Sequence, residues 1–240
     1  MAIIGSCLSP DERDNEMAKA WFDAVEEMVF DDDWLDEDLG AATHSPDVTG
    51  ESQRLESLQA AYFVCLYQNW EGSDSSKARI RRHRYNTLIA VARSLQRTSA
   101  THQDFSLLND ESMFEWARFI GMETKIRTLC YIYLLDGAFT IFNNTPPRIV
   151  IFEMQMSLTS PDETFQAVTA TECFSLLKKW VPTIPRYNQC SIASALETLC
   201  KPVLDIEERS LFTNMGILNM FSMITGMATS TDYDSMLTHA

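Results

Sequence analysis

A long run of helix-spaced apolar residues, Met113–Arg148, most constrains what this chain can fold into. Glu123 and Arg127 stand four residues apart within it, in the order that favours an ion pair. The pattern stops at 143–147, Asn-Asn-Thr-Pro-Pro, because Asn accepts a left-handed cap and Pro cannot continue a helix. The run predicts a long, mostly buried helix without recognisable catalytic machinery. Its inward residues are expected to be Phe119, Met122, Ile126, Leu129, Tyr133 and Ile141, with Cys130 and Leu134 beside them.

The same spacing predicts further helices on both sides of this run. They are expected at about 55–69, 76–95, 160–180 (continuous or broken), 191–201 and 205–227. Val168 should face inward on the third and Phe221 on the last, which is apolar on several faces and needs neighbours on more than one side. Residues 153–158 alternate apolar and polar, which predicts an extended segment. We therefore predict an all-α, irregular multi-helix domain, with an α+β fold carrying a hairpin near 149–158 as the alternative.

The N-terminal region is predicted to be a separate helix followed by an acidic linker. Ser9-Pro10-Asp11-Glu12 has the composition of a helix start, with Ser9 as the N-cap. Met17, Trp21, Val25 and Met28 then form one apolar stripe. Residues 40–51 are small, polar and broken by Pro and Gly. We place the domain boundary there, with residues 1–50 as helix and linker and 51–240 as the main domain. A version of the main domain truncated at its C-terminus is the alternative for 51–240.

The acidic segment at residues 31–39 has two interpretations. It surrounds Trp34, Leu35 and Leu39 with six carboxylates, a composition that suits an amphipathic docking or activation peptide. Acidic runs are more often solvated linkers, and this interpretation is slightly favoured. The first interpretation makes those three apolar residues the anchors for a partner protein.

Charge argues against unaided DNA binding. The chain carries 34 acidic and 19 basic residues, a net charge of −15, which repels a phosphate backbone. One concentrated basic patch, Lys77–Arg84, opens the helix predicted at 76–95. Its arginines are spread around the helix, so a face neutralised by the chain's own acids is favoured over a nucleic-acid element. A nuclear-import signal remains open and requires the patch to be exposed.

Motifs for metal, nucleotide or hydrolytic chemistry are missing from the sequence. The six cysteines include no Cys-x-x-Cys pair and read as reduced thiols, and no Cys and His spacing fits a zinc finger. There is no glycine-rich phosphate loop, Gly-x-Ser-x-Gly or His-Glu-x-x-His. The start lacks the pattern of a signal peptide, and the most apolar stretch, 211–228, is too polar for a membrane span. We expect no cofactor, no metal and no membrane association.

Asp136 is the carboxylate whose role the sequence leaves open. It lies in an apolar run, so it should be hydrogen-bonded to backbone or to a basic group, Arg148 being the first candidate. The competing hypothesis is an all-helical enzyme that uses Asp136 with Glu123 or His83. The structural role is favoured, because catalysis requires a second group that the sequence does not identify.

A set of short motifs follows one another along the chain: Ala92-Arg93-Ser94-Leu95, Trp116, Glu123-Thr124-Lys125-Ile126-Arg127, Leu134-Leu135-Asp136 and Thr145-Pro146-Pro147-Arg148, with Leu158 and Pro161 downstream. In this order the motifs resemble the fungal-specific transcription factor domain, and the sequence of residues 131–148 is most similar to the branch attached to Cys2His2 fingers. The likeness spans roughly residues 52–228 by element order and spacing.

The resemblance implies a helical regulatory region of a nuclear transcription regulator that is not an enzyme. Glu123, Arg127, Asp136, Pro146, Pro147 and Arg148 would be its motif residues. Such a region acts through other proteins, such as the transcription machinery or co-regulators, through a second copy as a homodimer, or through a small effector. It would reach DNA, and hold zinc, only through a finger missing from this chain. A scaffold or co-regulator without any DNA-binding half is the alternative.

Overall fold

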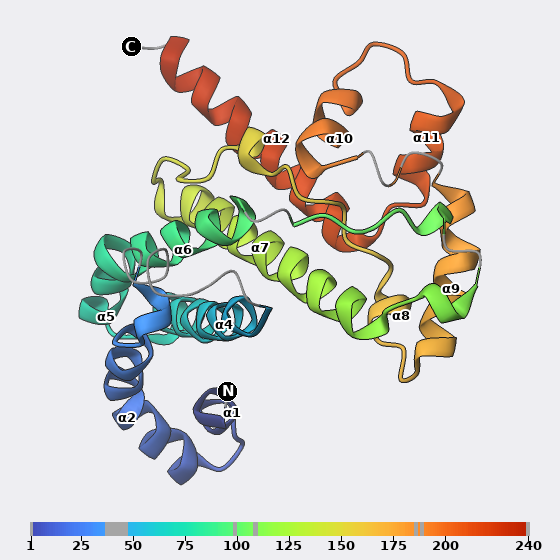
Figure 1. Ribbon diagram of the computed structural model, residues 1–240. Helices are drawn as coiled ribbons and strands as arrows, with labels where there is room; N and C mark the ends of the chain where they lie inside the picture. Colours follow the sequence, from blue (N-terminus) through green and yellow to red (C-terminus); the bar gives the residue numbers. More distant parts are fainter. Residues whose placement is uncertain are drawn as a thin grey trace. The chain divides into compact units, whose positions relative to one another are not determined.

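The computed structural model describes residues 2–36, 48–97, 100–107, 110–184, 187 and 190–238. Over these ranges the chain is built from helices, and the one pairing of extended backbone is an isolated antiparallel bridge between Ser157 and Ser191. The predicted all-α fold is confirmed, and the hairpin of the alternative fold is not formed. The chain divides into two compact units, Met1–Leu95 (unit 1) and Gln96–Ala240 (unit 2), whose helices are labelled in Figure 1.

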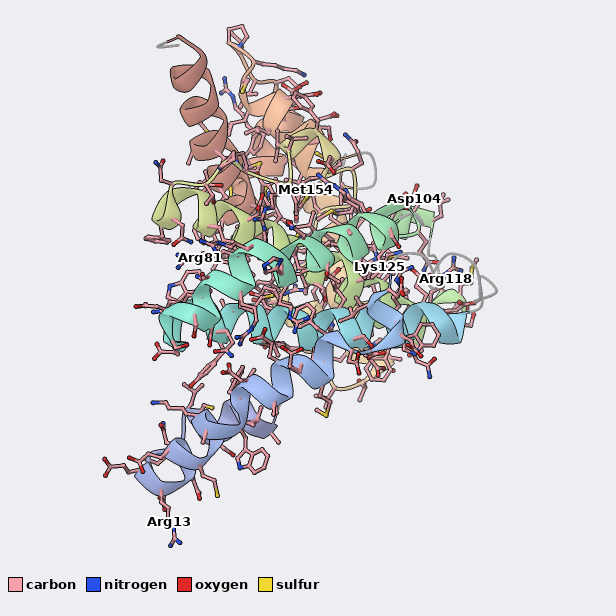
Figure 2. The ribbon with its side chains drawn as sticks, turned by 90° about the vertical axis from the view of Figure 1, so that its left-hand side faces the viewer. Arg13, Arg81, Asp104, Arg118, Lys125 and Met154 are labelled. Atoms are coloured by element: carbon pink, nitrogen blue, oxygen red, sulfur yellow. The ribbon has the colours of Figure 1, made fainter. Side chains whose placement is uncertain are left out.

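The described part of unit 1 consists of helices and helical turns. They are α1 (Ala2–Cys7), α2 (Glu12–Phe30), the 3-10 turn η1 (Asp33–Leu35), α4 (Val48–Glu71), α5 (Asp74–Arg79), the π-helical turn η2 (Ile80–Arg84) and α6 (Tyr85–Arg97). The helix predicted at 76–95 is thus present, but one widened turn interrupts it. Figure 2 shows Arg13 at the end of α2 that lies away from α4, and the other part of α2 packs on α4.

Helix α2 differs from the sequence prediction at its start and in its orientation. Its N-cap is Asp11, whose carboxylate accepts hydrogen bonds from Arg13 N and Asp14 N, so Ser9 as the N-cap was wrong. The inward face carries Ala18, Phe22 and Glu26, and Phe22 stacks on Tyr67 of α4 with ring centroids 4.3 Å apart. The predicted apolar stripe faces outward. We call it the α2 stripe, and it consists of Met17, Trp21 and Met28, all exposed, with the half-buried Val25.

The predicted boundary near residue 50 does not coincide with the division between the compact units. Helices α1 and α2 and the turn η1 pack with α4 in unit 1, and that unit extends to Leu95. Residues 37–47, which carry most of the predicted linker, lie outside the described residues. The boundary between residues 1–50 and 51–240 stays a prediction.

Unit 2 is organised around one long helix, as the sequence predicted. Its elements are η3 (Phe105–Leu107), η4 (Glu111–Met113), α7 (Trp116–Asn143), η5 (Ile151–Glu153), α8 (Asp162–Phe165), α9 (Ala170–Trp180), η6 (Val181–Thr183), α10 (Ile192–Leu199), α11 (Ile206–Thr213) and α12 (Ile217–Thr238). Figure 1 shows α12, in red, crossing α7, in yellow-green, and these two helices pack together. Helix α7 ends at Asn144, which takes the left-handed conformation with φ 50° as predicted.

Three side chains expected to face inward in unit 2 are exposed. Ile141 lies near the end of α7 and is 53% exposed. Val168 is 82% exposed because α9 begins only at Ala170, after the short α8. Phe221 is 55% exposed. The extended segment after η5 is present, with Met154, Met156 and Leu158 fully buried.

The helix predicted at 205–227 is two helices. Helix α11 ends at Thr213, α12 begins at Ile217, and their axes differ by 107°. The intervening Asn214-Met215-Gly216 contains two poor helix formers, and the backbone N–H of Asn214 closes α11 on Ser210. Within the described ranges no single helix is long and apolar enough to cross a membrane, and α11 with the first part of α12 reaches that composition only as this bent pair.

Candidate functional site

The motif residues Glu123 and Arg127 form the centre of a buried polar cluster in unit 2. Glu123 Oε1 accepts hydrogen bonds from Arg127 Nε at 2.7 Å and from the backbone N–H of Ser160 at 3.0 Å. Its other oxygen lies 2.7 Å from Nε2 of His102. Arg127 also binds the carboxylate of Asp162 at 2.6 Å and the backbone oxygen of Ser160 at 2.8 Å. We call these five residues the Glu123 cluster.

The centre of the Glu123 cluster is buried, whereas the carboxylate of Asp162 at its edge is 56% exposed. The side chains of Glu123 and His102 are 0% and 2% exposed, and that of Arg127 is 10% exposed. Although burial disfavours the charged guanidinium, the carboxylates of Glu123 and Asp162 hold the pKa of Arg127 above its ordinary value. The guanidinium also lies 4.6 Å from the ring centroid of Phe165. The cluster ties α7 to the segment before α8 and to the loop before η3.

Aromatic rings surround the imidazole of His102. Phe105, Phe119 and Tyr187 lie with ring centroids 5.2 to 6.5 Å from it. The hydroxyl of Tyr187 donates to the backbone oxygen of Leu158 at 2.6 Å, and burial raises the pKa of Tyr187 well above its ordinary value. A cavity of about 350 Å³ opens beside the imidazole. It is lined by Thr101, His102, Gln103, Phe105, Arg118, Phe119 and Met122.

The motif residues Asp136, Pro146, Pro147 and Arg148 are connected by hydrogen bonds between the Asp136 carboxylate and the backbone that follows the prolines. Asp136 Oδ2 accepts hydrogen bonds from the backbone N–H groups of Arg148 and Ile149, both at 2.7 Å. The two prolines have no N–H, so these are the first backbone donors available after them. One buried carboxylate therefore fixes where the chain leaves the end of α7. Of the two partners expected for Asp136, backbone or a basic group, these hydrogen bonds establish the backbone.

The motif carboxylates do not converge into a catalytic pair. Asp136 and Glu123 lie thirteen residues apart on one straight helix, about 20 Å at 1.5 Å per residue. Both oxygens of Glu123 and one oxygen of Asp136 are held in the contacts described above. His83, the other proposed partner, is exposed on η2 in unit 1. In the ranges that the structure describes, no group of three or more His, Cys, Asp or Glu residues is arranged to hold a metal ion.

Two arginines of the basic patch, Arg79 and Arg84, are paired with carboxylates of α2, which agrees for these two residues with the predicted neutralisation by the chain's own acids. Glu26 of α2 is fully buried and accepts from Arg79 Nε at 2.6 Å and Arg84 Nε at 3.2 Å. Asp23 binds Arg79 at 2.8 Å, and Glu27 binds Arg84 at 2.5 Å. We call these five residues the Glu26 clamp. Gln68 of α4 completes it by donating to both Asp23 and Glu26.

The proposed docking residues of the acidic segment have different surroundings. Leu35 is 2% exposed and Trp34 is half-buried in the turn η1, which packs on α4. The carboxylate of Asp32 fixes this turn by accepting from Trp34 N and from the hydroxyl of Ser57 on α4. Leu39 lies outside the described residues. Leu35 is therefore already bound within unit 1, and docking by this segment stays a prediction.

Sequence reasoning missed two central residues of these clusters. His102 lies in a loop and no periodicity marks it, so its contact with Glu123 depends on tertiary folding alone. Glu26 could have been found, because it stands four residues after Phe22 and eight after Ala18 on the inward face of α2. The apolar stripe on the opposite face gave the stronger signal and concealed it.

Comparison with known proteins shows which kind of protein the chain that carries these clusters is similar to. No family model and no solved structure matches the chain. Over 227 residues, 95% of its length, the chain is 44% identical to a protein named transcription factor verF from Penicillium polonicum. The match covers 31% of that protein, so the chain spans about a third of its relative's length. Both the Glu123 cluster and the Glu26 clamp thus belong to a chain that is homologous to part of a fungal transcription factor.

Proposed function

We propose that this chain is the helical regulatory region of a fungal transcription regulator and acts through protein contacts rather than through chemistry. The observation that carries the proposal is the similarity of nearly the whole chain to one part of a transcription factor. The clusters agree with it, because Glu123, Asp136 and Glu26 are each held in structural contacts. Regulation occurs in the nucleus in this proposal, and the chain performs no catalytic step.

DNA recognition is assigned to a zinc finger outside these 240 residues, in keeping with the resemblance to the Cys2His2-associated branch. The net charge of −15 opposes contact with phosphates, and the Glu26 clamp neutralises two arginines of the basic patch. The isolated chain should therefore bind duplex DNA weakly and without sequence preference. Tight, sequence-specific binding in a mobility-shift titration would overturn the assignment.

The direct test fuses the 240-residue chain to an unrelated DNA-binding domain in a fungal nucleus. Reporter transcription should differ from that produced by the DNA-binding domain alone, upward for an activator and downward for a repressor. The matched control is the fusion carrying Glu123→Ala, which should lose the effect because the regulatory unit no longer folds around its buried cluster. Equal reporter output from the wild-type fusion and the bare DNA-binding domain would refute a regulatory role.

The acidic segment can be tested within the same fusion. Trp34→Ala and Leu39→Ala remove two of the proposed anchors, and Leu35→Ala removes the anchor that unit 1 already buries. If 31–39 is a docking peptide, the first two changes reduce the reporter effect while circular dichroism stays unchanged. An unaltered reporter would identify the segment as a linker.

A further inference from the structure

Helix α12 presents its polar face to the protein and its apolar face to water. Its inward side chains against unit 2 are mostly polar and at most 9% exposed: Asn219, Ser222, Thr225 and Thr229, with Met223 between them. Its outward side chains are large and apolar, and we call them the α12 stripe: Ile217 at 82% exposed, Phe221 at 55%, Ile224 at 56%, Met227 at 46% and Met220 at 36%. This is the reverse of the amphipathic pattern expected for a surface helix.

The orientation of α12 is fixed by specific contacts, so the helix cannot turn its apolar face inward. Asn219 accepts from the backbone N–H of Thr159 at 2.9 Å and from its hydroxyl at 3.0 Å, and donates to its carbonyl oxygen at 2.9 Å. At the crossing with α7, a methyl group placed on Gly137 would lie 2.2 Å from Thr225 Cγ2. Turning α12 would break buried hydrogen bonds and bring larger side chains against Gly137. The exposure of the α12 stripe is thus built into the fold.

The charge and spacing of the α12 stripe suit a second copy of the same chain. Residues 217–229 contain no ionisable side chain. Two copies of a protein with net charge −15 repel each other, so an uncharged face is where they can approach at the smallest electrostatic cost. The stripe residues Ile217, Met220, Ile224 and Met227 are separated by three, four and three positions. This spacing is the same in both directions along the helix. Such a stripe is complementary to itself across a two-fold axis.

We propose that two copies of this chain associate through the α12 stripe, helix against helix, in an isologous dimer. The five side chains expose on the order of 500 Å² of apolar surface, the size at which patches on monomers are often functional. Burying two such faces removes about 1,000 Å² from water, near the lower limit for a specific interface. The dimer should therefore be reversible, with a Kd of roughly tens of micromolar. This inference is independent of the proposed role in transcription.

Sedimentation of the purified 240-residue chain from about 1 to about 200 µM tests the proposal. The wild-type chain should pass from monomer to dimer over this range, and about 1 M NaCl should not dissociate the dimer, because it contains no ion pair and salt screens the repulsion. Phe221→Glu and Ile224→Glu should each weaken the dimer at least about tenfold, because they place a carboxylate in the interface. The control is Val168→Glu, which changes an apolar side chain that is even more exposed and lies outside α12, and it should leave Kd within about twofold.

A second measurement keeps the proposal falsifiable if a glutamate variant fails to fold. Ile224→Cys in the otherwise unchanged chain should form a disulfide-linked dimer under mild oxidation much faster than Val168→Cys does. Equal cross-linking of the two variants would overturn the proposal. So would a wild-type chain that stays monomeric at the highest concentration, or a dimer whose Kd is unchanged by Phe221→Glu and Ile224→Glu.

Discussion

Helices α2 and α12 both expose a stripe of large apolar side chains and bury polar groups on the inward face, beside Ala18 and Phe22 in α2, but they are held in different ways. Helix α2 is fixed in unit 1 by charges, with Glu26 and Asp23 bound to arginines of the basic patch. Helix α12 is fixed in unit 2 by uncharged hydrogen bonds and close packing, chiefly at Asn219 and at the Gly137 crossing. One attachment therefore depends on ion pairs, and the other depends on uncharged hydrogen bonds and close packing.

The outer stripes of the two helices differ in the same sense. The α2 stripe runs between exposed carboxylates, including Asp14, Glu16 and Glu27, so two copies of it would place like charges together. The α12 stripe lies in an uncharged run. The charges of the residues beside an exposed apolar face thus influence which partner that face can bind. The neutral run of α12 is the one that suits a second copy.

The largest expected effect concerns the Glu26 clamp. Glu26→Ala leaves Arg79 and Arg84 without their shared buried carboxylate, so unit 1 should lose about 3 kcal/mol of unfolding free energy. Urea denaturation measures the loss. The matched control is Glu27→Ala, which removes a carboxylate that is 64% exposed and should cost less than about 0.5 kcal/mol. Equal costs would mean that burial of the pair is unimportant.

Removing the side-chain amide of Asn219 should have the next largest effect. Asn219→Ala deletes three buried hydrogen bonds and leaves the N–H and carbonyl of Thr159 without them, at a cost of about 2 kcal/mol. Denaturation gives the free energy, and labelling of Cys130 on α7 reports local opening. That thiol is fully buried, burial raises its pKa to about 12, and it should react slowly until unit 2 opens. Asn214→Ala, at an exposed amide, should change neither quantity.

The crossing of α7 and α12 can be tested by a compensating pair. Gly137→Ala places a methyl group 2.2 Å from Thr225 Cγ2 and should cost roughly 1 to 2 kcal/mol. Thr225→Ser removes that methyl and should restore more than half of the loss in the double variant. The control, Gly121→Ala, lies on the same helix with no atom within 4 Å of the new methyl and should stabilise slightly. Additive costs for Gly137→Ala and Thr225→Ser would disprove the close contact.

The smallest expected effect is an acid dependence confined to α2. Burial alone would raise the pKa of Asp23, but hydrogen bonds from Gln68, Arg79 and Ser76 lower it below its ordinary value of 3.8. The unfolded chain therefore takes up this proton at a higher pH than the folded one. The contribution is present above about pH 4 and is lost as pH falls through the folded value.

Asp23 is 65% exposed, so its contribution should be only a few tenths of a kcal/mol. Asp23→Asn should make the loss of stability between about pH 5 and pH 3 slightly smaller than in the wild type. Urea midpoints at the two pH values measure it. A variant that loses as much stability as the wild type would show that the ion pair contributes nothing.

The sequence predicted the elements well wherever local signals agree. The long central helix, its left-handed cap at Asn144 and the helix before the Glu71-Gly72 turn all follow from spacing and from Asn, Gly and Pro. The pairing of Asp136 with backbone was one of two partners derived from its apolar surroundings. The pairing of Arg79 and Arg84 with acids followed from the net charge and from the spread of the arginines around the helix.

Contacts that depend on the tertiary fold were not predictable from the sequence. Periodicity shows that α2 and α12 are amphipathic but does not show which face is inward, and it favoured the wrong face at Phe221. Polar inner faces are anchored by residues about 40 to 60 positions away, such as Gln68 for Glu26 and Thr159 for Asn219. No local sequence pattern indicates contacts between residues so far apart in the chain. The contact of His102 with Glu123 was missed for the same reason.

The π-helical turn η2 explains how one glutamate holds two arginines that are five residues apart. On a regular α-helix, Arg79 and Arg84 would point about 140° apart, since each residue advances about 100°. The wider turn, with its hydrogen bonds five residues apart, brings both guanidinium groups to Glu26 Oε1. In evolutionary terms the turn is equivalent to the insertion of one residue into an α-helix that continues on both sides. Deleting one residue between Ile80 and Arg84 would restore an ordinary helix and separate the two arginines, so insertions and deletions here should be rarer than substitutions.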